Sequence, residues 1–278
     1  MALRSLLKPL RLNWHASARN YSGANSLVSV TINDKNGIAT VSMDRKPVNG
    51  LNYELLRDLN KALEGLEGKA KGAILTSSLP TIFSGGLDIM EMYKPEKERV
   101  KNFWTQLQET WMCLFNTSYP TVAAINGHSP AGGCLLAMSC EYRVMVEKFT
   151  IGLNETKLGI VAPFWFIGSM QNTISTRNAE LALTEGKLFT TEEALKIGLV
   201  DEIATNKEDA LIKAEGFFKR FDKVNPLARQ FTKTSLRGDL VNKLRDEQEE
   251  DLEKFLFYVF QPKVQDGLEK YMQALKKK

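Results

Sequence analysis

Histidine and cysteine are scarce in this chain of 278 residues, which restricts the metal and redox chemistry open to it. The two histidines are His15 and His128, and the three cysteines, Cys113, Cys134 and Cys140, form no C-x-x-C pair. Structural zinc sites are built from four Cys or His ligands at characteristic spacings, so we expect no metal site. The cysteines are instead expected to be small buried side chains in a reducing compartment.

A long apolar run is also missing. No stretch approaches the ~18 consecutive apolar residues that a membrane-spanning helix needs. Hydrophobic residues make up 43% and charged residues 25%, which are the proportions of a globular domain rather than of a disordered chain. The length fits one large domain or two small ones.

Acidic residues are absent before Asp34, whereas cations occur at Arg4, Lys8, Arg11 and Arg19. Removing these four cations from the total of 37 leaves 33 basic side chains, equal to the 33 acidic ones. The rest of the chain therefore has no basic excess that would favour nucleic-acid binding.

The start of the chain has the composition of a mitochondrial presequence, because it carries Arg, Leu and Ser and lacks acids. Its leucines can line one helical face opposite the cations, and Arg19-Asn20-Tyr21 before Ser22 resembles a matrix-peptidase site. We predict that residues 1–21 direct the protein to the mitochondrial matrix and are removed there. The alternative is an N-terminal tail without function.

The apolar pattern predicts strands and helices that alternate over roughly the first 160 residues. Two β-rich runs joined by Asp-Lys-Asn-Gly indicate a hairpin, at 27–33 and 37–43. Further strands are expected at 72–76, 121–125, 142–146 and 199–203, and helices at 52–66, 96–115, 134–139 and through most of the chain after 163. We therefore predict an α/β fold with a core at 22–205 and a helical C-terminal region at 206–278.

Several nucleotide and hydrolase signatures are missing or incomplete. The chain has no G-x-G-x-x-G and no G-x-x-x-x-G-K-[ST] motif, so the usual phosphate cradles are absent. Residues 127–131 (GHSPA) nearly match the G-x-S-x-G nucleophile elbow. A serine hydrolase of that type needs a His later in the chain, and none follows His128. We therefore do not expect a serine hydrolase.

Two glycine-bearing loops stand out, at Phe83–Asp88 (FSGGLD) and Pro130–Cys134 (PAGGC). Each follows a predicted buried strand and is expected to open a helix, where backbone N–H groups lack partners. Two such N–H groups that converge can bind one oxyanion. Each loop taken alone is better explained by ordinary turn chemistry; the functional interpretation depends on both loops together with the next motif.

A lone carboxylate follows these loops. Glu155 has no acidic neighbour between Lys148 and Glu180, and its surroundings are apolar, including the cluster Phe164-Trp165-Phe166. A carboxyl group in apolar surroundings has a raised pKa and can exchange protons near neutral pH. The alternative is a surface or helix-capping glutamate.

Together the three motifs resemble the crotonase (enoyl-CoA hydratase/isomerase) superfamily. The family pattern F-x-x-G-x-D-hydrophobic falls on Phe83–Ile89, its A-x-x-G…G-G-C segment on Ala124–Cys134, and its catalytic segment on Ile151–Gly159. The resemblance implies a spiral of β-β-α units, a helical C-terminal region that forms homotrimers, and acyl-CoA thioester substrates. It implies no metal or other cofactor, because coenzyme A is part of the substrate.

The resemblance also assigns roles by position. It places the two oxyanion N–H groups on Leu87 and Gly132 and the catalytic acid/base on Glu155. Hydratases of the family carry a second Glu where this chain has Leu135, so an isomerase that moves the double bond of 3-enoyl-CoA to give 2-trans-enoyl-CoA in β-oxidation is implied. The alternatives are a hydratase and an inactive member that only binds. The implied substrate-binding residues are Gly85, Gly86, Leu87, Asp88, Ile89 and Gly132.

Three details stay open at this point. Arg45 and Lys46 are weak candidates for contacts with the coenzyme A phosphates. Phe255, Phe257 and Phe260 are all candidates to close the acyl tunnel. The apolar face of residues 252–259 is expected to need a partner surface, which favours a homotrimer. The alternative is that this face packs on its own subunit.

Overall fold

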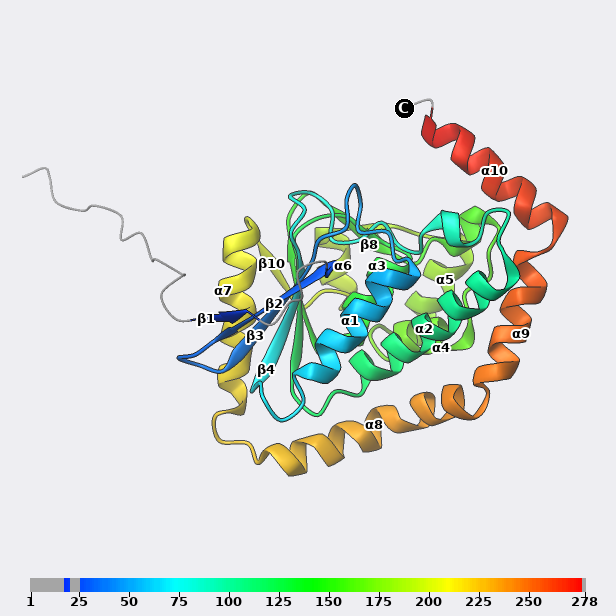
Figure 1. Cartoon of the computed structure of the whole chain (residues 1–278). Coiled ribbons are helices and arrows are strands. Elements are labelled where there is room, and N and C mark those ends of the chain that lie inside the picture. Colours follow the sequence, from blue (N-terminus) through cyan, green and yellow to red (C-terminus); the bar gives the residue numbers. More distant parts are fainter. Residues whose placement is uncertain (1–17, 21–25, 277–278) are drawn as a thin grey trace, which may run out of the picture.

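A seven-stranded sheet forms the centre of the computed structural model, which describes residues 18–20 and 26–276 (Figure 1). Its strand order is β1-β2-β3-β4-β5-β7-β10. The strands from β3 to β10 run parallel, and β1, β2 and β3 pair antiparallel. The strands are β1 Ala18–Asn20, β2 Val28–Asn33, β3 Ile38–Met43, β4 Gly72–Ser77, β5 Thr121–Ile125, β7 Tyr142–Val146 and β10 Glu202–Ala204.

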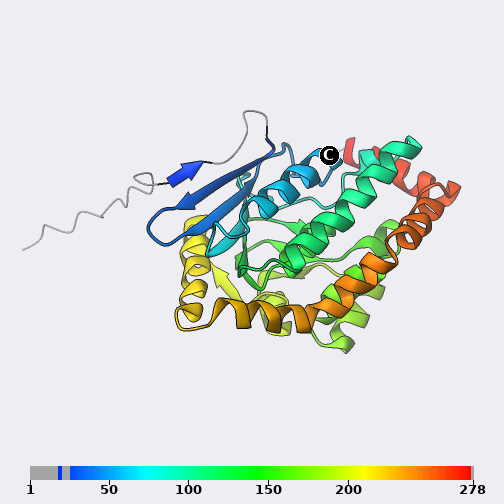
Figure 2. The ribbon, with the colours of Figure 1, turned by 60° about the horizontal axis from the view of Figure 1, so that its bottom comes forward.

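Helices cover both faces of this sheet (Figures 1 and 2). On one face, α1 (Tyr53–Gly65), α2 (Lys97–Phe115) and α3 (Gly132–Ser139) enclose the main apolar core. On the other face, α7 (Lys207–Phe218) packs against β4, β5, β7 and β10 through a smaller core that includes Ala210 and Ala214. Burial of both faces explains why the parallel strands are continuous apolar runs.

A second, three-stranded sheet joins the parts of the chain that carry the sequence motifs. It consists of β6 (Ser129–Pro130), β8 (Thr150–Gly152) and β9 (Phe189–Thr190). Pro130 pairs with Gly152, and the Ala131 N–H donates to the Gly152 carbonyl at 2.8 Å. The second glycine loop is thereby fixed beside the strand that leads to Glu155.

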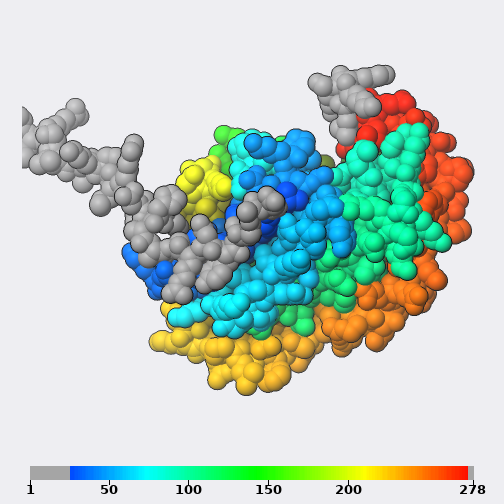
Figure 3. Space-filling model, in the orientation of Figure 1, coloured from blue at the N-terminus to red at the C-terminus, as the bar shows by residue number. Residues whose placement is uncertain are grey.

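The C-terminal half is helical and wraps around the body. After α4 (Phe164–Gln171), α5 (Thr176–Glu185) and α6 (Thr191–Ile197) come α8 (Pro226–Asp246), α9 (Gln248–Val259) and α10 (Pro262–Lys276). These last three helices run along the lower and right margins of the molecule in Figure 3. A basic row on α8 attaches it to the body: Lys233 donates to the Thr117 carbonyl and to Glu141, and Arg237 to the Phe115 and Ser139 carbonyls. Cations at the ends of α2 and α3 also complement the helix dipoles.

The α/β fold and most predicted elements are confirmed, but three expectations differ. The first glycine loop opens only a 3₁₀ turn, Ile89–Glu91, and the strand expected at 199–203 is β10, which begins at Glu202. The apolar face of α9 is covered by the chain itself. Leu252 and Val259 belong to its core, and Phe255 and Leu256 pack against that core. The prediction that this face is unpartnered was therefore wrong, because α9 folds back onto α2.

Candidate active site

The first glycine loop leaves a single backbone donor free. The N–H groups of Phe83 and Ser84 donate to the His128 carbonyl, and those of Gly85, Gly86 and Asp88 donate to Val48, Ser84 and Leu51. The Leu87 N–H has no acceptor among the described residues. Leu87 is half-buried, so this one unpaired donor is available to a ligand.

The second glycine loop supplies another donor at the start of α3. Gly132 is the first residue of the helix, two positions earlier than the sequence predicted, so its N–H lies in the turn that lacks intrahelical acceptors. Ala131 before it adopts φ 49° and ψ −123°, a conformation that side chains disfavour. Strain of this kind is concentrated at functional sites.

The two loops touch each other at their glycines. A Cβ built on Gly132 would lie 3.3 Å from the Leu87 nitrogen, and one built on Gly86 would lie 3.4 Å from the Gly132 nitrogen. Gly86 also needs φ +90°, which glycine adopts freely. The two free N–H groups are therefore close neighbours, as a shared oxyanion would require.

Glu155 begins a 3₁₀ turn, Glu155–Leu158, just beyond β8. Its side chain is only 6% exposed, and its Oε1 is buried without a hydrogen-bond partner among the described residues. Burial raises the pKa of this carboxyl from its ordinary 4.5 to about 7, and no other charged group contributes. A carboxyl with that pKa can both take and return a proton at neutral pH.

Apolar side chains near the catalytic motifs in the chain are buried in the core. Leu135 and Cys134 are completely buried on the first turn of α3, and Leu153 is buried on the segment that carries Glu155. Burial raises the pKa of the Cys134 thiol further above its ordinary range, so it remains protonated. Position 135, where the family resemblance predicts a second Glu in hydratases, is held by this buried leucine.

The other predicted substrate-binding residues shape the first loop. Asp88 caps the 3₁₀ turn by accepting from the Met90 N–H and forms an ion pair with Arg45 at 2.7 Å. Arg45 is thus engaged within the protein, whereas Lys46 is exposed. Gly85 is exposed and Ile89 half-buried, so the loop presents both polar backbone and an apolar side chain.

An apolar cavity of about 230 Å³ is lined in part by the segment that follows Glu155 in the chain, starting at Gly159. It is lined by residues 159–164, by Trp104 of α2, and by Phe255 and Tyr258 of α9. The Trp104 and Phe255 rings stack with their centroids 3.6 Å apart. Phe257 and Phe260 do not line the cavity and are 67% and 44% exposed.

Asp251, which lines the cavity, was not predicted from the sequence. It is buried, and one carboxylate oxygen accepts from the ring nitrogens of Trp104 and Trp165 and from Gln108. It thereby ties α9 to α2 and α4. Only an acidic position on the inner face of a helix hinted at it in the sequence.

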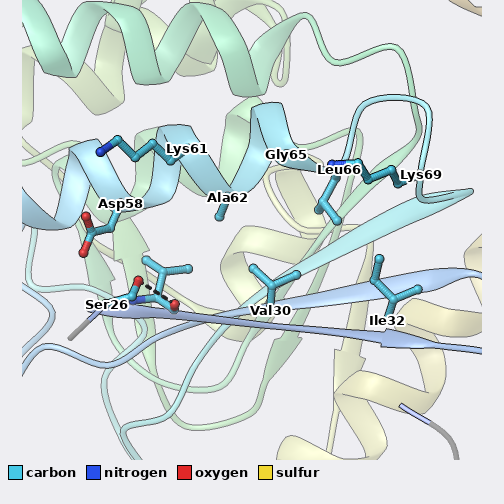
Figure 4. A pocket seen from close by; sticks show the side chains of 10 residues that line it. Ser26, Val30, Ile32, Asp58, Lys61, Ala62, Gly65, Leu66 and Lys69 are labelled. Atoms are coloured by element: carbon cyan, nitrogen blue, oxygen red, sulfur yellow. Dashed lines mark hydrogen bonds between the residues drawn. The ribbon is translucent and has the colours of Figure 1, made fainter. Parts of the chain in front are cut away.

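A larger hollow, about 370 Å³, lies elsewhere, between β2 and α1 (Figure 4). Val30 and Ile32 of β2 line one side of it, and Leu66, just after α1, lines the other together with Asp58 and Lys61 of α1. None of the residues predicted for the site lines it. Size alone therefore does not identify the active site.

The His and Cys side chains of the described part of the chain have local contacts or are buried. His128 Nδ1 pairs with Thr150, and residues 18–20 and 26–276 contain no group of three or more potential metal ligands. Cys134 and Cys140 are buried and Cys113 half-buried, all unpaired, as predicted. No helix in these ranges is long and apolar enough to cross a membrane.

The spiral α/β fold, the paired glycine loops and the buried glutamate define a protein of the crotonase type. Residues 33–278 match the enoyl-CoA hydratase/isomerase family, and the chain belongs to that family. It is 41% identical to mouse mitochondrial enoyl-CoA delta isomerase 1 over 259 residues, which cover 92% of this chain and 89% of the mouse protein. The family resemblance is thus confirmed.

Solved structures agree with this assignment. The crystal structure of human mitochondrial delta3-delta2-enoyl-CoA isomerase superposes with a TM-score of 0.88 at 37% identity, covering 91% of this chain and 99% of that one. An enoyl-CoA hydratase from Bacillus halodurans gives a TM-score of 0.79 at 25% identity, with 88% and 99% covered. Since a hydratase also shares the fold, the reaction must be argued from the site.

Proposed function

We propose that this protein is an enoyl-CoA delta isomerase that converts 3-cis- or 3-trans-enoyl-CoA into 2-trans-enoyl-CoA. The observation that carries the proposal is the buried carboxyl of Glu155, whose Oε1 has no hydrogen-bond partner among the described residues and whose pKa is raised to about 7. The family resemblance adds Leu135, which stands where hydratases carry a second Glu. The names of the mouse and human relatives support the same reaction. The metabolic setting proposed is β-oxidation of unsaturated fatty acids.

The proposed mechanism uses one acid/base group and two donors. In a 3-enoyl thioester the carbon-2 proton is both α to the carbonyl and allylic. Glu155 removes it, and the electron pair spreads through a dienolate onto the thioester oxygen. The N–H groups of Leu87 and Gly132 stabilise that oxyanion, and each such donor contributes roughly 3 kcal/mol elsewhere. Glu155 then returns the proton to carbon 4, so the steps are proton transfers and require neither a metal nor another cofactor.

Hydration is the alternative reaction. Adding water across the 2-enoyl double bond requires a water molecule that is held and activated, which two carboxylates do in the hydratases of this family. Here Leu135 has replaced one of them, and a dry site favours proton transfer. Assaying the protein on 3-enoyl-CoA and 2-enoyl-CoA in parallel tests the proposal: isomerisation of the first without hydration of the second supports it, and the reverse refutes it.

The pH dependence follows from the raised pKa of Glu155. Because the carboxylate form accepts the first proton, kcat/KM for 3-enoyl-CoA should rise with pH up to about 7 and stay level above it. Below the pKa it should fall about tenfold per pH unit. A profile that stays flat down to pH 5, with the protein shown to be folded by circular dichroism, contradicts the role of Glu155.

We further propose that the cavity beside Trp104 and Phe255 holds the acyl chain. The cavity has a volume of about 230 Å³ and a mainly apolar lining, which suits methylene groups rather than polar ones. Phe255→Ala should therefore shift the preference toward chains two carbons longer, by about tenfold in relative kcat/KM at about 0.8 kcal/mol per buried methylene. Phe257→Ala, the same change at an exposed position of α9, is the control. Equal selectivity in both variants rules out this placement.

A homotrimer is proposed as the functional assembly. The apolar face of α9 no longer supports it, but Leu227 and Phe231, one turn apart on α8, are 58% and 63% exposed. Exposed neighbouring apolar side chains favour a protein interface. Light scattering should give about three times the mass of one chain, 31.3 kDa before processing, whereas a monomer contradicts the proposal.

We also propose import into the mitochondrial matrix, with residues 1–21 as the presequence. The names of the mouse, rat and human relatives support mitochondria as the location. Residues 1–17 lie outside the described part of the chain, while Ala18–Asn20 pair with the edge of β2. N-terminal sequencing of the protein from purified mitochondria should find a start near Ser22.

A further inference from the structure

We infer that Asn49 is a positioning residue that holds the Leu87 N–H in place for the oxyanion. This inference rests on the proposed function. Asn49 lies between β3 and α1 and is completely buried. Its φ of +48° is in the left-handed region, which asparagine tolerates better than most residues.

The side chain of Asn49 joins three segments of the chain. Its Nδ2 donates to the Ser77 Oγ at 2.7 Å, beyond which the chain leaves β4, and to the Phe83 carbonyl at 3.0 Å. Its Oδ1 accepts from the Arg45 N–H at 2.7 Å. One amide thus connects the ends of β3 and β4 to the first residue of the glycine loop.

The backbone of Asn49 continues this connection toward Leu87. Its carbonyl accepts from the Ser84 hydroxyl at 2.8 Å, and the Ser84 Oγ accepts from the Gly86 N–H at 3.2 Å. On either side, Gly85 donates to the Val48 carbonyl and Leu51 donates to the Gly86 carbonyl, both at 2.8 Å. Residues 48–51 therefore hold the loop on both sides of the free donor, because the Asp88 N–H also donates to the Leu51 carbonyl, at 3.1 Å.

The chemistry of the amide explains why asparagine is suited to this position. The side chain must donate to a carbonyl and a hydroxyl while it accepts from an N–H. Aspartate has nearly the same shape but no donor, so its oxygen would face the Phe83 carbonyl without a bond. Glycine keeps the left-handed backbone but has no side chain to hold Phe83. Asn49→Asp and Asn49→Gly should therefore let the glycine loop at 83–88 shift. The rest of the protein should stay folded, because its hydrophobic core does not include Asn49.

The test compares Asn49→Asp and Asn49→Gly with wild type and with Asn242→Asp, an exposed position on α8. With 3-enoyl-CoA, kcat should fall by about 10- to 100-fold, since complete loss of an oxyanion donor costs about 10²- to 10³-fold. KM should change little, because most substrate contacts remain. Asn242→Asp should match wild type.

A second measurement reports on the oxyanion site without turnover. Acetoacetyl-CoA ionises to an enolate with its own ultraviolet absorption, and N–H donors at its oxygen lower the pH at which the bound ligand ionises. A tenfold weaker oxyanion site raises that pH by one unit. Both Asn49 variants should therefore show ionisation one to two units higher than wild type.

These readouts separate the possible outcomes. Reduced kcat with raised ionisation pH supports the inference, and unchanged values of both overturn it. If wild type does not isomerise 3-enoyl-CoA, the proposed function fails, yet the enolate measurement still tests the placement of Leu87. If the Asn49 variants do not fold, Ser84→Ala removes only the hydroxyl link from Asn49 to Gly86. An unchanged enolate titration in that variant overturns the inference, whereas a raised one supports it.

Discussion

Replacing Glu155 by glutamine is expected to slow isomerisation by at least about 10²-fold, up to about 10⁴-fold, the range that a placed acid/base group contributes. Glutamine preserves the size and polarity of the side chain but cannot accept the carbon-2 proton. No neighbouring acid can replace it in the sequence, because Glu155 is the only carboxylate between Lys148 and Glu180, and its side chain is buried. Steady-state kinetics with 3-enoyl-CoA would measure the loss.

Two controls accompany this variant. Glu185→Gln makes the same change at an exposed position and should keep full activity. Binding of a saturated acyl-CoA to Glu155→Gln should remain close to wild type, because the thioester donors and the acyl cavity are unchanged. Turnover above about a tenth of wild type would be incompatible with a general base in this position.

The same substitution should also make the protein more stable above neutral pH. Between pH 4.5 and 7 the folded protein keeps the Glu155 proton while the unfolded chain has lost it, so the free energy of unfolding decreases as pH rises through this window. At pH 8 the ionised, buried carboxylate costs on the order of 3 kcal/mol. Glutamine removes that cost, so its stabilising effect should appear at pH 8 and disappear near pH 4.5 in denaturant titrations.

The sequence predicted the strands and the motif positions well because both depend on local patterns. Buried parallel strands are continuous apolar runs, and the helix at α1 shows a clear helical period with Asn52 as its N-cap. Glycine pairs after β4 and β5 indicated loops, and the parallel strand order brings their carboxyl ends to one edge. Glu155 could be singled out because few charged residues surround it in the sequence.

Features that depend on contacts distant in sequence were not predictable. The Asn-Gly pair at 49–50 indicates a turn, but nothing local shows that Asn49 would reach Ser77 and Phe83. Likewise, the apolar face of α9 has the same pattern whether it packs on its own chain or on another. In the structure this face packs on α2 of the same chain. Trp104 of α2 stacks on Phe255 and donates a hydrogen bond to Asp251, both on α9.

The free N–H of Leu87 also depends on contacts that the local sequence does not show. The sequence predicted that the first loop would open a helix and so expose an N–H group, as the second loop does. The loop instead opens a 3₁₀ turn, and Leu87 has the one N–H of residues 83–88 without an acceptor among the described residues. The family resemblance pointed to this position, and its role in binding an oxyanion stays a prediction.

Gly132→Ala is expected to reduce kcat by about 10²-fold or more while the fold is retained. The new Cβ would lie 2.9 Å from the Leu51 Cδ1, 3.1 Å from the Leu87 Cδ2 and 3.3 Å from the Leu87 nitrogen. The leucine side chains can turn away, but the Leu87 nitrogen must shift by a few tenths of an ångström, which moves that donor relative to Gly132. Each oxyanion donor contributes about 10²- to 10³-fold elsewhere. Gly132 is at the first position of α3 with an ordinary helical backbone, where alanine is the better helix former.

A matched control distinguishes the steric effect from a general effect of the added methyl group. Gly216 lies exposed on α7, and a Cβ there meets nothing within 4 Å. Gly216→Ala should keep wild-type kinetics and gain up to about 1 kcal/mol of stability. If Gly132→Ala is folded and as active as Gly216→Ala, the contact between the two glycine loops does not place the oxyanion donors. A loss confined to Gly132→Ala, seen in kcat far more than in KM, is the result expected when ground-state binding persists and only the developing charge on the thioester oxygen loses its stabilisation.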